Sequence, residues 1–416
     1  MRMIALSLIL LALTVATAMA GVSDKCFEEM PFGCLLIRSD IIPKDQADSI
    51  GRKLGAPLRR LSNNYLRIQG KPVQVNILEA ATPTDAVRIH KTISAMKGHP
   101  AFCLIQDNKV IEFCNADVAT AIKTSYELGF SPKPRKILYG LTAQISTINK
   151  ADYLSFNELF NVFLNTNTKN PSQESINKIK TLSRDFIFGT SISLRKQPNR
   201  STSYEFTPSA VEITDMPPDQ TSYSFKQIPN VLGIPFVTLS ARITCDDTGM
   251  TPTDRKADKG LLSATSYWPV DDPQIQALAK KITSEKSTSE AKALAILEWL
   301  TPGKNIKSAG PTGSRWGVKK VLKQMYGNCW DSSDCFITLA RAAGVPSRQI
   351  GGWLYGTGGH IWAEVLIEGK GWQQVDPTGG GKLSCGIYHI PYFTTESGEM
   401  PILYLSIPQI AILEME

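Results

Sequence analysis

The sequence contains little histidine, which limits the kinds of metal site that it can build. Only four of the 416 residues are histidines: His90, His99, His360 and His389. A zinc site made from neighbouring ligands needs C-x₂₋₄-C pairs or histidines at short spacing, and neither pattern occurs near the cysteines. We therefore expect no metal and no other cofactor.

No dense run of positive charge marks a nucleic-acid surface. The net charge is +7 and the sequence pI is about 8.8, but the basic residues are spread along the chain. The longest local cluster, at residues 52–60, is typical of a solvated face. We expect no nucleic-acid partner.

Beyond its N-terminus, the chain has no apolar run long enough to cross a bilayer. Residues 1–20 combine Arg2, an apolar stretch over 4–15 and an A-x-A-like triplet at 18–20. This arrangement is typical of a secretory signal peptide cleaved before Gly21, with an uncleaved anchor as the alternative. We expect a secreted or periplasmic protein without a transmembrane segment in the mature chain.

Export would place the cysteines in an oxidising compartment, where they tend to pair. Eight are present: Cys26, Cys34, Cys103, Cys114, Cys245, Cys329, Cys335 and Cys385. One expected disulfide joins Cys245 either to Cys335 or to Cys385, and the sequence does not choose between them.

Two disulfides can be argued locally. The segment FCLIQDNKVIEFC predicts a β-hairpin that turns at residues 108–109, a register that places Cys103 opposite Cys114 within disulfide reach. Cys26 and Cys34 flank a short loop that contains proline and glycine, and a disulfide between them would close it.

The chain is too long for one ordinary domain and predicts an α+β protein of three parts. Residues 21–130 alternate strands and amphipathic helices, as at 73–78 and 83–96, and predict a small α+β domain of unknown role. Residues 131–260 predict a β-rich domain, for which a sandwich is one arrangement. Residues 261–416 form the third part, with helix starts at Asp272-Pro273 and at a capping box over 287–290.

A helix that starts at a cysteine is predicted in the third part. In GNCWDSSDCFITLARAAGVPSR, Asn328 is a good N-cap residue and Gly344 marks the end. The free N–H groups and the positive end of the helix dipole would stabilise a thiolate at Cys329. Cys335 lies on another side of the same helix, which disfavours a disulfide between the two. The alternative is an inert Cys329 bonded to Cys335 or another cysteine.

The segment that follows supplies a histidine and an aspartate. Residues 349–376 predict three strands joined by glycine-rich turns, with His360 opening the middle strand and Asp376 closing the last one. The two side chains share a face only if the turn between their strands has an odd number of residues or a bulge. We therefore predict a three-residue turn at 368–370, because a four-residue turn would put Asp376 on the wrong side.

These residues predict a nucleophilic triad. We expect Cys329 to attack an acyl carbon and His360 to hold the thiolate as an ion pair and then protonate the leaving amine. Asp376 would orient the imidazole and stabilise its charge. The backbone N–H of Cys329 can donate to the oxyanion, and Trp316 is a candidate for the second donor.

Other candidates carry weaker signals. Trp330 and Trp362 are candidate substrate walls, with a place in the core as the alternative reading. We expect His90, His99 and His389 to be surface or structural residues.

Three blocks of sequence, YGNCWDSSDCFITLARAAGVPSRQIGGW, HIWAEV and GWQQVDPT, resemble the transglutaminase-like superfamily over about residues 261–390. By this resemblance, the family's nucleophile, histidine and aspartate fall on Cys329, His360 and Asp376. The resemblance implies a papain-like α+β core in which the cysteine helix packs on an antiparallel sheet. The acidic clusters that bind calcium in the animal transglutaminases are not evident, so no calcium dependence is implied.

The motifs and the resemblance together predict an exported enzyme that acts on peptide or isopeptide bonds of a protein or peptide substrate through a thioester. Deacylation by water gives a protease or amidase, and deacylation by an amine gives a protein-glutamine γ-glutamyltransferase that makes crosslinks. Nothing marks an amine-binding tunnel or a calcium switch, which favours hydrolysis. A non-catalytic binding protein with a retained fold is the alternative, and the sequence gives no signal of oligomeric state.

Overall fold

The fold is described from a computed structural model of the chain. The described residues are 34–68, 71–95, 102–116, 118–130, 134–150, 159, 162, 171–184, 187–196, 203–216, 219–226, 235–251, 253, 256, 258–301, 305–310, 313–355, 358–378, 385, 387–399, 402–404 and 408–416. The predicted signal peptide lies outside them, as do Cys26 and residues 27–33 of the loop that a Cys26–Cys34 disulfide would close. None of the helices in these ranges combines the length and the apolar composition needed to span a bilayer.

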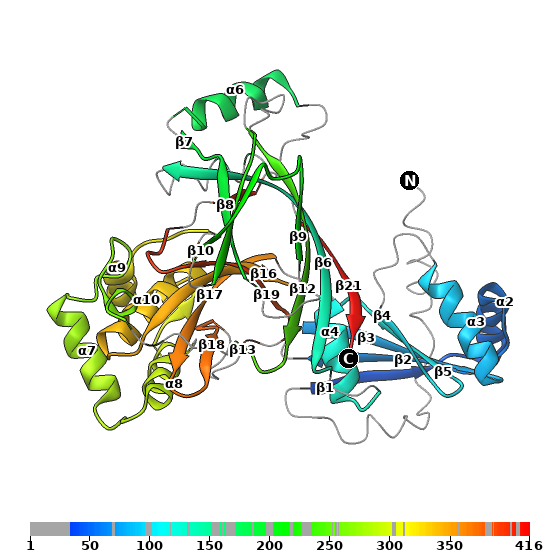
Figure 1. The fold of residues 1–416 in the computed structure, drawn as a ribbon. Coiled ribbons are helices and arrows are strands. Elements are labelled where there is room, and N and C mark those ends of the chain that lie inside the picture. Colours follow the sequence, from blue (N-terminus) through cyan, green and yellow to red (C-terminus); the bar gives the residue numbers. More distant parts are fainter. Residues whose placement is uncertain are drawn as a thin grey trace. The chain divides into compact units, whose positions relative to one another are not determined.

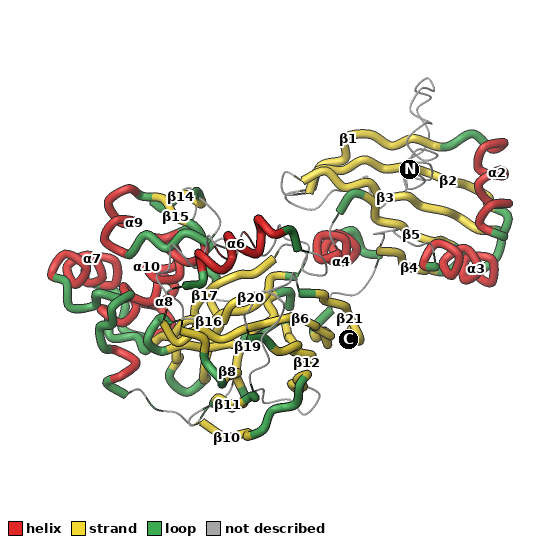
Figure 2. The backbone as a smooth tube through the Cα atoms, turned by 90° about the horizontal axis from the view of Figure 1, so that it is seen from above, coloured by secondary structure: helices red, strands yellow, loops and turns green. Residues whose placement is uncertain are grey.

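The chain forms two compact units, residues 1–133 and 134–416, which are called unit 1 and unit 2. Unit 1 holds an antiparallel sheet of five strands in the order β1-β2-β3-β5-β4 (Figure 2). Its elements are β1 (Cys34–Ile41), α2 (Lys44–Leu54), β2 (Leu58–Ile68), β3 (Lys71–Ala80), α3 (Pro83–Ser94), β4 (Phe102–Gln106), β5 (Lys109–Cys114) and α4 (Val118–Glu127). Alternate residues of the strands bury their side chains on opposite faces, so α2 and α3 pack on one face and α4 on the other.

The predicted disulfide between Cys103 and Cys114 is wrong. The hairpin turns one residue earlier than predicted, at 107–108, and Cys103 therefore faces Glu112. Asp107 takes a left-handed φ of 53°, which a short polar side chain tolerates in a tight turn. The expected bridges of Cys245 are also absent, because six cysteines in the described part of the chain are free: Cys103, Cys114, Cys245, Cys329, Cys335 and Cys385.

Unit 2 begins with β-rich structure. Strands β20, β6, β12 and β9 form a sheet in that order, β21 and β7 also pair with β6, and a second sheet has the order β10-β11-β8. The bounds are β6 (Lys136–Lys150), α6 (Gln173–Leu182), β7 (Ile187–Phe188), β8 (Ser191–Arg195), β9 (Ser203–Thr207), β10 (Glu212–Met216), β11 (Gln220–Ser224), β12 (Val237–Asp246), β20 (Ile402–Tyr404) and β21 (Gln409–Met415). Strands from the end of the chain thus complete a sheet that starts at β6 (Figure 1). The predicted division into two domains near residue 260 stays a prediction.

The rest of unit 2 packs helices against an antiparallel sheet with the order β13-β18-β17-β16-β19. Its elements are β13 (Met250–Thr251), the 3₁₀ helix η2 (Gly260–Leu262), α7 (Pro273–Thr283), α8 (Ser289–Leu300), β14 (Lys307–Ser308), α9 (Val318–Gln324), β15 (Tyr326–Gly327), α10 (Cys329–Ala342), β16 (Ser347–Leu354), β17 (Gly358–Ile367), β18 (Gly371–Val375) and β19 (His389–Thr395). The α+β class predicted from the sequence is confirmed, with the cysteine helix α10 beside this sheet.

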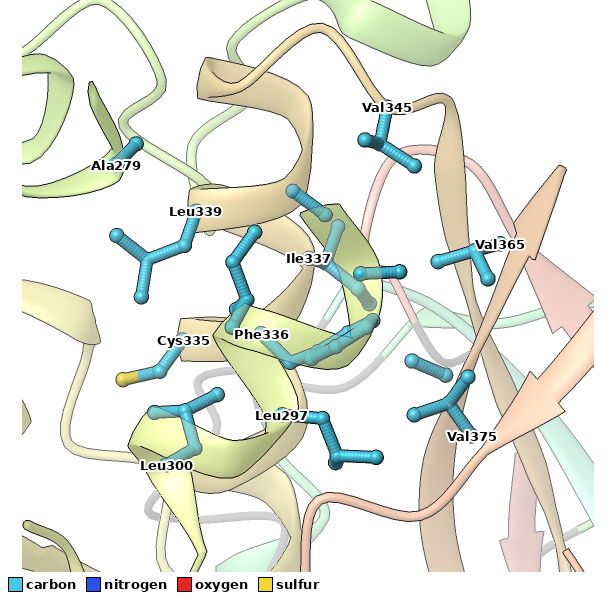
Figure 3. Packing of buried hydrophobic residues seen from close by; sticks show 14 of the residues in the cluster. Ala279, Leu297, Leu300, Cys335, Phe336, Ile337, Leu339, Val345, Val365 and Val375 are labelled. Carbon is cyan, nitrogen blue, oxygen red and sulfur yellow. The ribbon is translucent and has the colours of Figure 1, made fainter. Parts of the chain in front are cut away.

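Helix α10 contributes several residues to one of the two large hydrophobic clusters of unit 2. Its residues Phe336, Ile337 and Leu339 are fully buried and pack with side chains of α8, β17 and β18 (Figure 3). Cys335 also lies in this cluster, as expected of a packed structural cysteine. Burial of so many apolar side chains around one helix fixes where its first residue sits relative to the sheet.

The predicted helix starts are confirmed at one place and corrected at another. Asp272 caps α7 by accepting hydrogen bonds from the backbone N–H groups of Gln274 and Ile275. At α8 the cap is Thr288 rather than the first residue of the predicted box, because its hydroxyl accepts the N–H of Ala291. Since neighbouring serine and threonine residues cap equally well, sequence alone does not choose between adjacent cap positions.

A buried ionic network joins the β-rich part to the sheet beside α10. Glu364 on β17 receives two hydrogen bonds from Arg195 on β8, at 2.7 and 3.0 Å. Arg348 on β16 donates to the same carboxylate through Nε at 2.9 Å, and all three side chains are at most 2% exposed. Burial alone raises the pKa of Glu364, but the two guanidinium groups outweigh it and hold that pKa below its usual range. The network therefore stays ionised and ties β8 to β16 and β17.

Glu364→Ala should lower the free energy of unfolding of unit 2 by about 3–5 kcal/mol, because it leaves the buried guanidinium of Arg195 without its carboxylate partner and removes one partner of Arg348, which keeps Asp219. All seven tryptophans lie between residues 268 and 372, so tryptophan fluorescence in a denaturant titration reports on this unit alone. Glu368→Ala, at an exposed glutamate four residues on, is the matched control. Equal midpoints for the two variants would show that the network does not stabilise the unit.

Candidate active site

The N-terminus of α10 is built as the sequence predicts. Asn328 caps the helix by accepting the N–H of Trp330 at 2.9 Å, and Asp331 completes a capping box by accepting the N–H of Asn328 at 3.2 Å. Cys329 is the first helical residue and is partly exposed. Its backbone N–H has no acceptor within the helix and lies at the positive end of the dipole. Both features favour negative charge at this sulfur.

Asp331 also ties a loop to the start of α10. Its second oxygen accepts the backbone N–H of Trp316 at 2.7 Å. Burial raises the pKa of Asp331 to about 6, although the two N–H donors act in the opposite direction. Gly327 is required beside it, because an added Cβ would lie 2.5 Å from the Cβ of Asp331. The backbone N–H of Trp316 is thus already bonded, which leaves its indole N–H as the group that could serve as the second oxyanion donor, and that role stays a prediction.

The strand register brings His360 and Asp376 together. The turn between β17 and β18 has three residues, 368–370, as predicted, with Ile367 paired to Gly371. Asp376 follows β18 on the face of the sheet that carries His360, and its Oδ2 lies 2.9 Å from Nε2 of that ring. Both side chains are about nine-tenths buried, which protects this hydrogen bond from water.

His360 contacts Cys329 through its other ring nitrogen. The Cys329 side chain is hydrogen-bonded to the imidazole, and since Nε2 faces Asp376, we infer that Nδ1 is the atom that faces the sulfur. Burial lowers the pKa of His360, but the hydrogen bonds to Asp376 and Cys329 outweigh it and raise that pKa to about 10. The structure thus places a cationic imidazole between a cysteine and a carboxylate.

A second histidine, which sequence reasoning had treated as surface or structural, contacts the same carboxylate. Nε2 of His389 lies 3.0 Å from Oδ2 of Asp376, the oxygen that also contacts His360. The other oxygen, Oδ1, accepts the backbone N–H and the hydroxyl of Thr378 at 2.9 and 2.6 Å. Burial raises the pKa of Asp376, but its hydrogen bonds to the two imidazoles outweigh that and hold the pKa well below the usual range.

The two candidate substrate walls are both buried. Trp362 is 0% exposed, donates its indole N–H to Gln374 at 3.0 Å and stacks under His360 with a centroid distance of 5.9 Å. Trp330 is 7% exposed, and the guanidinium of Arg315 lies 4.7 Å from its ring centroid. Neither ring can line an open binding surface. Trp362 instead packs against the His360 imidazole.

The remaining histidines, His90 and His99, belong to unit 1 and not to unit 2, which carries the site. His90 in unit 1 contacts the backbone carbonyl of Cys103 through Nε2 at 3.1 Å, which fits the structural role expected for it. His99 lies outside the described residues.

Comparison with known proteins supports the resemblance seen in the sequence. Residues 276–377 match a family described as the transglutaminase-like superfamily, and this segment contains Cys329, His360 and Asp376. The expected transglutaminase-like core is therefore confirmed in unit 2. No curated protein matches the chain.

Solved structures that are similar to the chain include two proteins provisionally described as proteases. One is a protein from Cytophaga hutchinsonii that is provisionally described as a cysteine protease. It is 16% identical to this chain with a TM-score of 0.39, and the match covers 68% of this chain and 92% of that chain. The other is a protein from Parabacteroides distasonis that is provisionally described as a protease. It is 10% identical with a TM-score of 0.23, and the match covers 74% of this chain and 64% of that chain. A third similar structure, red sea bream transglutaminase, is 13% identical with a TM-score of 0.23, and the match covers 60% of this chain and 47% of that chain.

The raised pKa of His360 predicts how stability depends on pH. A histidine whose pKa rises from 6.5 to about 10 on folding contributes stability that is complete below about pH 6.5 and is lost as the pH rises through about 10. The difference in unfolding free energy between the wild type and His360→Gln should therefore shrink between these limits. Asp376→Asn should reduce that dependence by removing the carboxylate, whereas the contribution of Cys329 remains. A difference that stays constant across this range would contradict the ion-pair assignment.

Proposed function

We propose that the protein is an exported, cysteine-dependent acyl-transfer enzyme that hydrolyses peptide or isopeptide bonds through a thioester. The observation that carries the proposal is the placement of the His360 imidazole, with Asp376 at one ring nitrogen and the Cys329 side chain hydrogen-bonded to the ring. The match of residues 276–377 to the transglutaminase-like superfamily supports it.

Acylation follows from the charges of this arrangement. The Cys329 thiolate attacks the carbonyl carbon of the scissile amide, and the carbonyl oxygen takes the negative charge. The backbone N–H of Cys329 can donate to that oxyanion at the N-terminus of α10. The His360 imidazolium then gives its proton to the amide nitrogen, the C–N bond breaks, and the amine leaves a thioester on Cys329. Asp376 stays ionised throughout and keeps the ring oriented.

Deacylation runs the same proton path in reverse. Neutral His360 takes a proton from water as the water oxygen attacks the thioester carbon, which releases a carboxylic acid and regenerates the Cys329–His360 pair. An amine in place of water would give an isopeptide crosslink and make the protein a transglutaminase. The partial exposure of Cys329 leaves the thioester open to water, which supports hydrolysis.

Export is compatible with the free thiols that the structure contains. Cys245, Cys335 and Cys385 are fully enclosed, and burial raises the pKa of each thiol. Burial also raises the pKa of Cys103 to about 12, with a further contribution from Glu112. Thiols that do not ionise exchange slowly with disulfides, so these cysteines can persist unpaired outside the cytoplasm. Cys329 differs from them in having an imidazole partner.

This difference between Cys329 and the other cysteines predicts that an alkylating reagent labels Cys329 selectively. Iodoacetamide should alkylate native wild-type protein at Cys329 far faster than a free thiol near neutral pH, because only this described cysteine pairs with a cationic ring. Cys329→Ala measures the background from all other cysteines, and peptide mass spectrometry locates the label. Labelling of Cys329 no faster than a free thiol, or its recovery in a disulfide, would support the non-catalytic binding protein instead.

The reaction itself is tested with a protein substrate that offers both glutamine and lysine, together with a fluorescent amine. Hydrolysis predicts new fragments or released ammonia without incorporation of the amine. We expect Cys329→Ala to reduce the rate by about a thousandfold or more, because the nucleophile is lost. Incorporation of the amine at the expense of hydrolysis would assign the transglutaminase reaction, and identical products from wild type and Cys329→Ala would exclude a cysteine enzyme.

A further inference from the structure

The carboxylate of Asp376 is saturated by hydrogen-bond donors, and one of them is a second imidazole outside the Cys-His-Asp triad. Oδ1 accepts two hydrogen bonds from Thr378, while Oδ2 accepts from His360 and from His389. A carboxylate offers about four lone-pair sites, so all of them are filled. Because Asp376 is about nine-tenths buried, the loss of any donor would leave an acceptor that water does not readily satisfy.

The strand order and the packing of the sheet bring the second imidazole, that of His389, to the Asp376 carboxylate. His389 opens β19, which pairs with β16, while Asp376 follows β18 on the other side of β17. Between them, β16 presents Gly352, where any Cβ would collide with the Trp362 ring and the carbonyl of Ile390. The indole of Trp362 occupies this space and meets the His389 ring edge to face, at 5.2 Å and 73°. A glycine and a buried indole thus hold His389 against the carboxylate.

The protonation of the two rings follows from the acceptor that they share. An ionised carboxylate only accepts, so Nε2 carries a hydrogen in both His360 and His389. Nδ1 of His360 faces the sulfur, whereas Nδ1 of His389 is buried without a partner among the described residues. Among the described residues, the bond to Asp376 is therefore the only hydrogen bond of the His389 ring.

The same three side chains also offer ligand atoms for a metal ion, all within 4.8 Å of one another. A metal-bound histidine nearly always anchors its second ring nitrogen to a carboxylate, carbonyl or water. Nδ1 of His389 has no such anchor among the described residues, and Nδ1 of His360 faces Cys329. The arrangement fits a hydrogen-bonded cluster better than a metal site.

We propose that His389 is a positioning residue that fixes the Asp376 carboxylate and, through it, sets the orientation and charge of the His360 ring. The role deepens the proposed function and rests on it, since a positioned imidazolium matters only if Cys329 reacts. Without the donor at Nε2 of His389, Oδ2 would be free to rotate away from the His360 ring, and its hold on His360 would weaken. His360 would then lose its proton at lower pH.

The titratable groups that face this cluster come from several elements. Cys329 lies on α10, Asp376 follows β18, and Cys385 is a buried thiol whose pKa is raised by burial and by the charge of Asp376. Strand β16 contributes Gly352 and therefore no charge at this point. Asp376 bonds both rings, whose centroids lie 5.7 Å apart, and is thus the hydrogen-bonded group through which a change at His389 would reach His360.

The test uses the full-length chain and two variants of matched size. His389→Gln keeps a side-chain N–H that can donate to Asp376, whereas His389→Leu removes the donor and keeps apolar bulk. Histidine ring signals are titrated by NMR, where four histidines make assignment by single substitution simple. We expect His360 to titrate near pH 10 in the wild type, at clearly lower pH in His389→Leu, and close to the wild type in His389→Gln.

This readout does not require activity. If His360 titrates at the same pH in His389→Leu as in the wild type, with the variant folded by tryptophan fluorescence, the proposal is wrong whatever Cys329 does. If His360 shifts as expected but Cys329 shows no enhanced alkylation, the proposed function fails and the coupling between the histidines stands.

Two further measurements, of enzymatic activity and of metal dependence, complete the experiment. His389→Leu should lower kcat/KM by about 10- to 100-fold, the loss expected for one hydrogen bond to a charged group, and His389→Gln should recover most of it. The loss should fall on kcat, because His389 acts through the catalytic ring rather than on substrate binding. Wild-type activity that disappears on dialysis against a chelator and returns with Zn²⁺ would overturn the proposal in favour of a metal site.

Discussion

The hydrogen bond between Asp376 and His360 is the constraint on which the rest of the site depends. A carboxylate so deeply buried is costly unless its charge is compensated, and here four donors compensate it, one of them the cationic ring of His360. The ion pair in turn keeps His360 protonated, and the protonated ring is the partner that a thiolate at Cys329 requires. Each charge in the site is thus stable only because of its neighbour, which is why sulfur, ring and carboxylate function as one unit.

Separate structural features hold these charged groups in place. The capping box of α10 fixes the sulfur at the helix N-terminus, and the core around Phe336 fixes the helix against the sheet. The three-residue turn at 368–370 sets the face on which Asp376 emerges. Two positions beyond the indole of Trp362, on the same strand, the Glu364 network locks that strand to the β-rich part of unit 2. The β-rich part therefore supports the geometry of the site without contributing a charge to it.

Local signals in the sequence predicted much of the site. The N-cap at Asn328 and the parity of the turn before Asp376 could be read directly, because capping and strand alternation act over a few residues. The predicted Cys103–Cys114 register failed because a turn that begins one residue earlier shifts every cross-strand pair by two. His389 was missed for a different reason: its contact depends on β19 lying beside β16, and the order of strands in a sheet leaves no local pattern.

The most direct measurement is the ultraviolet difference spectrum between the wild type and Cys329→Ala at neutral pH. A thiolate absorbs where a thiol does not, and the buried cysteines with raised pKa values contribute equally to both proteins. The account predicts close to one additional thiolate in the wild type, which disappears when His360 is replaced by glutamine. Spectra that coincide at neutral pH would contradict it, because a neutral Cys329 would leave the charged ring and the carboxylate without the role assigned to them.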